Sequence, residues 1–460
     1  MDNVVYSTDY DQLASFIREQ MMLWSTSRVR VRRQPLLKQQ AYEERLSSLL
    51  SQDLSFEGEN TSYSRHNFHA FAAKFPPQLP AFFIENLTSE GEVVLDPMMG
   101  SGTALLEAEL LGRRAVGFDI DPLAWRVSFI KTVHLSKEKA AQAAARVIEK
   151  TRRAMEAPEA LREKLPRKFS PETLDFMNYW FLPSTQLELL ALSEAISSVE
   201  DSSVRVFLEV AFSAIIVTKS GGVTMARDLA HSRPHRVQDK TPKNAIDQFA
   251  KRVSKNLDSL TEALPENAVR IYRADARRMP LDDETIDLIV TSPPYANAID
   301  YMRAHKFSLV WLGEPIPKLS GLRSTYIGTE KTGREPAESF GPVSEKILSE
   351  LSRTDEKKRR VMSRYLRDMS QVYREMLRVL RPGRCAVIVV GSSTMHGLDV
   401  RTQDCLAEAA KSVGWNVIGM APRTISRNKR MMPMRRGSSG SSLIEQRMSQ
   451  EFVIGMVKPA

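Results

Sequence analysis

A turn with two glycines, within residues 93–103, has the composition of a ligand-binding loop. The segment reads V-V-L-D-P-M-M-G-S-G-T, in which an apolar run ends at Asp96 and is followed by Gly100 and Gly102. Glycine lets the backbone turn sharply and approach a ligand closely, and Thr103 then opens a helix whose free N–H groups face the same spot. A carboxylate at the start of such a loop can pair with an ammonium group. A plain strand–turn–helix corner can have the same glycines, so this loop alone leaves both interpretations open.

Two further acids favour a nucleoside ligand. Asp119 ends the next apolar run, in G-F-D-I-D-P, and Asp275 ends another, in R-A-D-A-R. An acid in the position of Asp119 can accept hydrogen bonds from ribose hydroxyls, and Asp275 could accept one from an adenine amino group. Acids at three consecutive strand ends suit adenosine linked to a positively charged tail. They suit phosphates poorly, and the sequence has no P-loop lysine motif.

Alternating strands and helices would bring these acids to one edge of a sheet. The predicted strands are short apolar runs between helical patterns, at 93–96, 115–119, 269–274, 286–290, 385–390, 415–420 and 452–457. They predict an α/β fold with a doubly wound, mostly parallel seven-stranded sheet that is covered by helices on both faces. In such sheets ligands bind beyond the carboxyl ends of the strands, which is where the acids and glycines fall.

Three stretches depart from this alternation. Residues 1–60 have the pattern of a helical N-terminal extension, and residues 136–265 carry much helical and little strand signal. The second of these predicts a helical insertion, which could serve as a target-recognition or dimer lobe. Residues 314–360 predict a long loop followed by a charged helix. The main domain would then consist of residues 61–135 and 266–460.

The composition excludes several classes of protein. No apolar run is long enough to span a membrane, and the N-terminus lacks the basic and apolar stretches of a signal peptide. The two cysteines, Cys385 and Cys405, can build neither a disulfide framework nor a four-cysteine zinc site. A cytoplasmic protein that needs no metal is therefore expected. The net charge of +9 favours a polyanionic partner, although charge alone is weak support.

Two motifs resemble those of the amino-group DNA methyltransferases, which methylate cytosine N4 or adenine N6. D-P-M-M-G-S-G-T resembles their cofactor motif D-P-F-x-G-S-G-T, with Met98 in place of the usual phenylalanine, and K-F-P-P resembles the segment before it. The resemblance covers roughly residues 65–135 and 265–460. It implies a class I methyltransferase, Rossmann-like fold with S-adenosylmethionine as the cofactor. The cofactor-binding residues that it implies, together with the acids above, are Lys74, Phe75, Pro76, Asp96, Pro97, Gly100, Ser101, Gly102, Thr103, Asp119 and Asp275.

The catalytic motif would be T-S-P-P-Y at 291–295, which follows a predicted strand and matches the family's S/D/N-P-P-Y/F pattern. The lone pair of an exocyclic amine is delocalised into the base ring, and acceptors on its N–H groups would restore it. The Ser292 side chain and the Pro293 carbonyl would be these acceptors, and the prolines, with Pro294, hold that carbonyl in one direction. Tyr295 would offer an aromatic face to a base rotated out of its stack. A rigid loop or a polyproline ligand has the same letters, but the position after a strand and downstream of three acids favours catalysis.

Serine at the first motif position, after threonine, resembles the N4-cytosine enzymes, whereas Asp or Asn is commoner in the N6-adenine enzymes. The resemblance therefore implies site-specific methylation of cytosine N4 in double-stranded DNA, on a flipped-out base. N6-adenine methylation stays open. So does methylation of RNA by an amino-group enzyme of the guanine-N2 type, because such enzymes have similar Pro-Pro-Tyr motifs. A regulator without catalysis is a third interpretation, against which the intact motifs argue. A homodimer and a restriction endonuclease partner are also open.

Basic stretches at 219–236, 357–360 and 423–436 are candidates for phosphate contacts. The last contains no acid and is predicted to bind DNA, while 357–360 is expected to be a solvated helix face. His305 and Lys306 could approach DNA, although a hydrogen-bonded histidine accounts better for His305. The predicted nucleic-acid-binding residues are Arg423, Arg427, Lys429, Arg430, Arg435 and Arg436.

Overall fold

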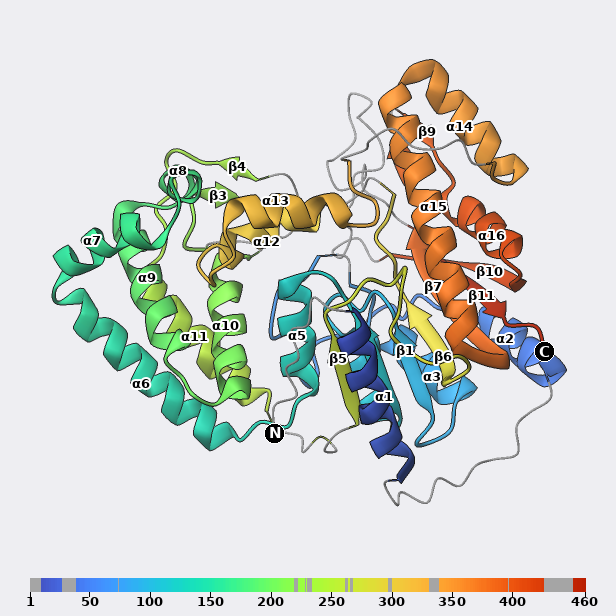
Figure 1. The fold of residues 1–460 in the computed structure, drawn as a ribbon, viewed down its shortest axis with the longest axis horizontal. Helices are drawn as coiled ribbons and strands as arrows, with labels where there is room; N and C mark the ends of the chain where they lie inside the picture. The colour runs from blue at the N-terminus through green and yellow to red at the C-terminus, as the bar shows by residue number, and fades with distance from the viewer. Residues whose placement is uncertain are drawn as a thin grey trace.

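The centre of the protein is a seven-stranded sheet in the order β10-β11-β7-β6-β1-β2-β5 (Figure 1). The computed structural model describes residues 10–26, 39–72, 74–218, 222–227, 229, 234–260, 264, 268–296, 300–330, 339–395, 397–425 and 450–460. The strands of this sheet are β1 (Val93–Asp96), β2 (Arg114–Phe118), β5 (Val269–Tyr272), β6 (Ile286–Thr291), β7 (Leu380–Gly391), β10 (Asn416–Thr424) and β11 (Gln450–Val457). Each neighbouring pair from β5 to β7 is parallel, and β11 runs antiparallel to both β7 and β10. The predicted doubly wound, mostly parallel sheet is confirmed.

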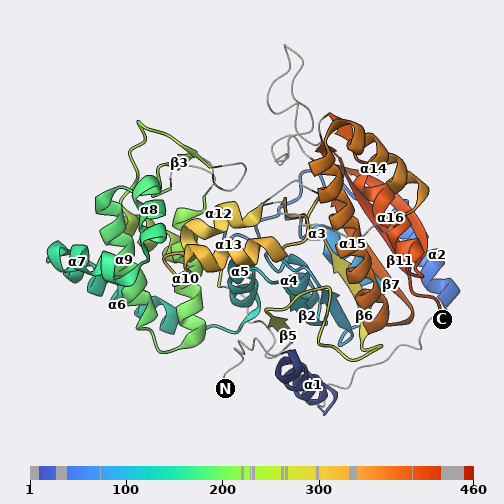
Figure 2. The ribbon, with the colours of Figure 1, turned by 45° about the horizontal axis from the view of Figure 1, so that its top comes forward.

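Helices cover both faces of this sheet, which explains why every side chain of β1 and β6 is buried. One face packs against α2 (Gln39–Leu50), α3 (Gln78–Leu87), α4 (Thr103–Leu110) and α5 (Pro122–Thr132). The other packs against α1 (Tyr10–Thr26), α15 (Glu356–Val379) and α16 (Thr402–Ser412), with α14 (Pro342–Thr354) lying on α15 and α16 (Figure 2). No helix in the described residues combines the length and the apolar composition of a membrane span.

The helices of the predicted N-terminal extension belong to this core. Leu46 and Leu49 of α2 are buried, and α2 packs against β7, β10 and β11. A Cβ added at Gly455 of β11 would come within 2.7 Å of the Leu50 side chain, which shows how closely helix and sheet approach each other. The extension therefore covers part of the sheet that carries the catalytic motif.

The predicted helical insertion forms a lobe beside the sheet, on the left in Figure 1. Its elements are α6 (Lys137–Met155), α7 (Pro158–Lys168), α8 (Pro171–Trp180), α9 (Pro183–Ser197), α10 (Ser202–Ile216), β3 (Ala226–Arg227), β4 (His235–Arg236) and α11 (Ala245–Asp258). Most side chains of α10 are buried, and this helix is the part of the lobe that packs against α5 and against α12 (Tyr301–Leu309) of the main domain. The lobe is thus joined to the helix that follows β2 and to the helix that follows the catalytic motif.

The stretch 314–360 differs from the predicted long loop followed by one helix. It contains α13 (Ile316–Thr325), α14 and the start of α15. Pro317 and Pro342 occupy the first turns of α13 and α14, where a missing N–H leaves no hydrogen bond unmade. The sequence pattern places these prolines in a loop, but in the structure they stand in the first turn of a helix. A short hairpin of β8 (Thr394–Met395) and β9 (Leu398–Asp399) follows β7.

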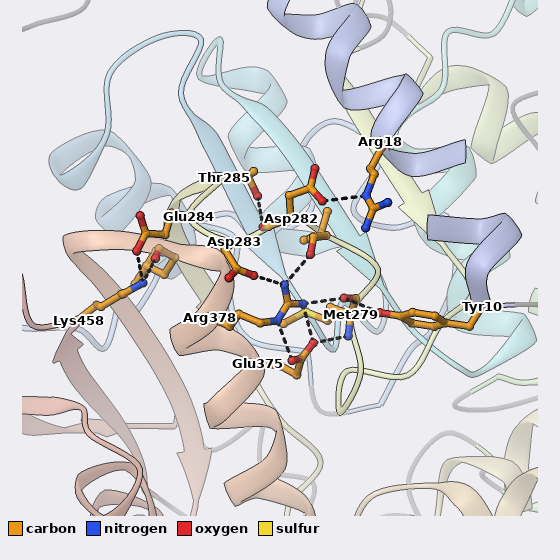
Figure 3. A network of polar contacts seen from close by, with 12 residues as sticks. Tyr10, Arg18, Met279, Asp282, Asp283, Glu284, Thr285, Glu375, Arg378 and Lys458 are labelled. Carbon is orange, nitrogen blue, oxygen red and sulfur yellow. Dashed lines mark hydrogen bonds and ion pairs between the residues drawn. The ribbon is translucent and has the colours of Figure 1, made fainter. Parts of the chain in front are cut away.

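Arg378 of α15 organises the connection between β5 and β6 (Figure 3). Its guanidinium donates to the carbonyls of Met279 and Leu281 and to the carboxylates of Asp283 and Glu375. Helix α1 contacts the same connection from another side. The segment that leads from the cofactor side of the sheet into the catalytic motif is therefore held by charged hydrogen bonds.

Replacing Arg378 with alanine is expected to lower the free energy of unfolding by about 2 kcal/mol, because carbonyls and carboxylates lose a charged donor. Chemical denaturation measures this change. Arg374→Ala, at an exposed position of the same helix, is the matched control and should change the free energy by less than about 0.5 kcal/mol. Equal stability of the two variants would show that the Arg378 network does not hold the connection.

Candidate active site

The turns after β1 and β6 lie side by side because the two strands are parallel neighbours. Leu95 pairs with Ile289 in this ladder. One step further along, the Thr291 hydroxyl donates to the Asp96 carboxylate, with 2.6 Å between the oxygens. The glycine turn and the 291–295 turn therefore start from one hydrogen bond at the carboxyl edge of the sheet, as expected for parallel strands.

A pocket at this edge collects residues from both turns. Of the residues predicted from sequence, it is lined by Lys74, Phe75, Asp96, Pro97, Gly100, Ser101, Thr103, Asp119, Asp275, Ser292 and Pro294. Gly102, Pro76, Pro293 and Tyr295 do not line it. Lining residues that sequence reasoning missed include Phe71, Met98, Asp121, Tyr301, Tyr326 and Ile327. The aromatic members come from segments without a recognised motif, so only the folded chain reveals them.

The two glycines of the turn are required by its geometry. Gly100 and Gly102 have φ angles of 49° and 70°, in the region that side chains avoid. A Cβ on Gly102 would meet the Ser128 hydroxyl at 2.8 Å. The N–H of Gly100 donates to the Asp119 carboxylate, with 3.0 Å between nitrogen and oxygen. The Asp119 carboxylate thus holds the glycine turn that follows Asp96.

Burial dominates the electrostatics of these two acids. It raises the pKa of Asp96 to about 7, against the hydrogen bonds from Thr291 and Met98. Burial, together with the neighbouring carboxylate of Asp121, raises the pKa of Asp119 to about 7. A cation bound in the pocket would favour the charged form of both.

Asp121 is held by hydrogen bonds from several elements. It caps α5 by accepting from the N–H groups of Leu123 and Ala124, and it accepts at 2.6 Å from the His305 ring and at 2.8 Å from the Tyr326 hydroxyl. Although burial acts to raise it, the charge and hydrogen bond of His305, aided by Tyr326, lower the pKa of Asp121 to about 2. Asp before Pro at a helix start is a capping signal that sequence reasoning could have used.

His305 is therefore a buried, hydrogen-bonded histidine, as the sequence favours. The Lys306 ammonium lies 4.8 Å from the centre of the Phe176 ring. His305 therefore contacts Asp121, which follows β2, and Lys306 contacts an aromatic ring of the lobe.

The residues of the catalytic motif alternate in direction. Ser292 and Pro294 line the pocket, whereas Pro293 and Tyr295 are buried away from it. Tyr295 is 5% exposed, and its hydroxyl donates to the Glu451 carboxylate over 2.7 Å. Burial, followed by the charge of Glu451, raises the pKa of Tyr295 well above its ordinary value. A base would reach the face of this ring only after neighbouring groups move.

The prediction that Arg423 contacts phosphate is wrong. Its side chain is buried, pairs with Glu451 and donates to the Leu54 carbonyl over 3.1 Å. A buried, paired guanidinium has no face to offer to DNA. The other predicted phosphate contacts, Arg427, Lys429, Arg430, Arg435 and Arg436, lie outside the described residues.

The sequence matches a family described as DNA methylase, of the N6/N4 methyltransferase type, over residues 8–129 and 286–440. These segments make up more than half of the chain and contain both turns of the pocket. The chain belongs to the N6/N4 DNA methylase family. It is a DNA methyltransferase whose methyl donor is S-adenosylmethionine. The segment between the two matched parts, 130–285, contains the helical lobe.

Similar proteins agree with this membership. The Type II methyltransferase M.MvaI of Kocuria varians is 25% identical over 405 residues, which cover 83% of this chain and 88% of that protein. The Type II methyltransferase M.BsoBI of Geobacillus stearothermophilus is 24% identical over 58% of this chain and 56% of its own length. A solved S-adenosylmethionine-dependent methyltransferase from Methanosarcina mazei is 11% identical and covers 82% of this chain and 97% of that one. Its TM-score of 0.30 is too low for the likeness to bear on function.

The pocket of this DNA methylase fits S-adenosylmethionine chemically. Four acids in its wall, Asp96, Asp119, Asp121 and Asp275, suit a ligand with an ammonium group, ribose hydroxyls and an adenine amine. Apolar side chains alternate with them, which suits the flat adenine ring. The pocket therefore matches both the polar and the apolar parts of the cofactor.

Asp96→Asn is expected to stabilise the cofactor-free enzyme more at about pH 8 than at about pH 5. The Asp96 carboxyl ionises more easily in the unfolded chain, so its effect lowers stability as the pH rises from about 3.9 to about 7. Asparagine does not ionise. It can also keep the contacts to Thr291 and Met98, since both use one oxygen.

Thermal unfolding of both proteins at the two pH values measures this difference. An equal gain at both, or a loss at about pH 8, would show that the Asp96 carboxyl does not resist ionisation in the folded state.

Proposed function

We propose that this DNA methyltransferase transfers the methyl group to the exocyclic N4 amine of cytosine, in a base rotated out of the duplex. The observation that carries the proposal is the Thr291–Asp96 hydrogen bond, because it sets Ser292 into the wall of the pocket that holds the acids. Serine at this motif position, rather than an acid or amide, favours cytosine. The placement supports attack by an amine that is held beside the methyl donor.

The Ser292 hydroxyl and the Pro293 carbonyl accept hydrogen bonds from the two N–H groups of the amine. These contacts favour a tetrahedral nitrogen and restore its lone pair as a nucleophile. S-adenosylmethionine supplies an electrophilic methyl group on a positively charged sulfur. Direct attack needs no covalent enzyme intermediate, and both cysteines are buried away from the pocket. The enzyme's work is therefore to position the two reactants.

The acids divide the binding of the cofactor between them. Asp96 pairs with the ammonium group, Asp119 accepts from the ribose and Asp275 accepts from the adenine amine. Arg277 holds Asp275 in place with 2.7 Å between Nη2 and Oδ2, and it also pairs with Asp368. The segment from Lys74 closes the methionine end of the pocket.

We infer that the lobe of residues 136–265 recognises the DNA target. At the end of the β3–β4 ladder farthest from the turn, Arg236 donates to the Tyr179 carbonyl over 2.7 Å, and its guanidinium lies 5.3 Å from the centre of the Tyr179 ring. Tyr179 is 54% exposed, which is unusual for a large aromatic side chain. The hairpin lies near α8 and α13 in both ribbon views. An exposed aromatic ring held by an arginine suits contact with DNA.

The relatives' names also suggest a partner. Both curated proteins above are named Type II methyltransferases. We infer that this enzyme protects host DNA against a restriction endonuclease of the same specificity. A homodimer stays a prediction.

Expression in a methylation-free host, followed by nucleoside mass spectrometry of DNA and RNA, tests the proposed reaction. N4-methylcytosine in DNA is the expected product. Ser292→Ala is expected to lower kcat by about 100-fold with an unchanged cofactor Kd, because Ser292 contacts the amine. Detection of N6-methyladenine would show that cytosine is not the target base. Methylated RNA in place of methylated DNA would show that DNA is not the substrate. Full activity of Ser292→Ala would show that Ser292 does not take part in catalysis.

Tyr179→Ala and Arg236→Ala are each expected to weaken binding of duplex DNA by about tenfold, with unchanged thermal stability and cofactor Kd. Fluorescence anisotropy with DNA from the methylation-free host measures the affinity. Arg153→Ala on α6, whose side chain is 74% exposed, is the matched surface control. DNA affinities equal to that of the control would remove the hairpin from the DNA-binding surface.

A further inference from the structure

We propose that Glu451 is a positioning residue for methyl transfer, which acts by holding the hydroxyl of Tyr295 and so fixing the end of the catalytic turn. Glu451 lies on β11, distant in sequence from the catalytic turn, and belongs to neither motif. The inference rests on the proposed function of residues 292–295. It adds Glu451 to the residues that support catalysis, and Glu451 acts only through its contact with Tyr295.

The catalytic turn is held at both ends by a carboxylate. At its start the Thr291 hydroxyl donates to Asp96 of β1 over 2.6 Å. At its end the Tyr295 hydroxyl donates to Glu451 of β11 over 2.7 Å. Between these two contacts lie the residues that face the pocket. The turn is therefore fixed against strands on both sides of β6 and not only by its own prolines.

Glu451 is itself fixed by a buried ion pair. It lies directly opposite Arg423 in the β10–β11 ladder. One carboxylate oxygen of Glu451 accepts from the Arg423 guanidinium, and the other accepts from Tyr295. Arg423 also donates to the Leu54 carbonyl, so the guanidinium is tied to the segment after α2. Tyr295, Glu451 and Arg423 are 5%, 8% and 6% exposed.

Stability alone does not require this arrangement. A buried ion pair loses hydration that its mutual attraction only partly replaces, and apolar residues of similar volume are often as stable. What the carboxylate adds is a directional, charge-assisted hydrogen bond to one hydroxyl. That bond restricts rotation of the ring. On its other side, the Tyr295 backbone packs closely on Gly328, where an added Cβ would lie 3.3 Å from the Tyr295 carbonyl oxygen.

The position of Tyr295 matters for the chemistry because the amine must be held within reach of the methyl group. A displacement of about 1 Å can cost about 100-fold in rate. Tyr295 lies in the same turn as Ser292 and Pro293, the two residues proposed to accept hydrogen bonds from the amine, with Pro294 between them and the tyrosine. A Tyr295 ring that is free to tilt would loosen this turn. Loss of Glu451 should therefore lower kcat more than it affects cofactor binding.

A double-mutant cycle between Glu451→Ala and Tyr295→Phe tests this proposal. The substrate is unmethylated DNA from the methylation-free host, with labelled S-adenosylmethionine. Each single variant is expected to lose at least about tenfold in kcat while the cofactor Kd stays unchanged. The double variant should lose no more kcat than the more impaired single variant, since both substitutions remove the same hydrogen bond. Glu451→Gln retains an acceptor oxygen and should recover part of the kcat.

Tyr295→Phe keeps the ring and the Arg423–Glu451 pair, so it tests the hydrogen bond even where Glu451→Ala fails to fold. Asp287→Asn is the matched control, because Asp287 is a buried, arginine-paired carboxylate at the opposite end of β6. It should change stability and leave kcat unaltered. Wild-type kcat in Tyr295→Phe, or losses that multiply in the double variant, would overturn the positioning role. A wild-type enzyme that methylates no DNA would instead refute the proposed function.

Discussion

The hydrogen bond between Thr291 and Asp96 is the contact on which the rest of the site depends. It joins the last residue of β6 to the last residue of β1, and each of these residues begins a turn. Parallel pairing of the two strands brings the turns to one edge of the sheet. The hydrogen bond fixes the position of one turn relative to the other. The pocket of this DNA methylase is lined by residues of both turns.

The same arrangement has an electrostatic cost. Asp96 is buried and Asp119 is half-buried. Loss of hydration raises the pKa of both acids, and the nearby carboxylate of Asp121 increases the effect on Asp119. An enzyme for a neutral ligand would gain stability by replacing them. A ligand with a positively charged sulfur and an ammonium group reverses the balance, because its charge favours the ionised acids. The acids therefore reduce the stability of the empty protein and strengthen its preference for a cationic cofactor.

The rest of the chain supports this edge of the sheet from three directions. Arg378 holds the connection that leads into β6. The buried pair of Arg423 and Glu451 holds the far side of the catalytic turn. The lobe reaches the site through α10, which packs on α5, the helix after β2, and on α12, the helix after the catalytic turn. Contacts made by the lobe with DNA would thus act on helices that border the pocket.

The sequence by itself determined the sheet, the order of its elements and the two turns, because glycine conformation, proline rigidity and acids at strand ends are local properties. It also placed the helical lobe, since helical periodicity is local. Only the tertiary structure decided that Arg423 is buried, that Glu451 meets Tyr295 and that Phe71, Tyr301 and Tyr326 line the pocket. These depend on which side chains meet across distant strands and helices. A charged residue near a strand end looks the same in sequence whether it faces DNA or pairs with a partner in the core.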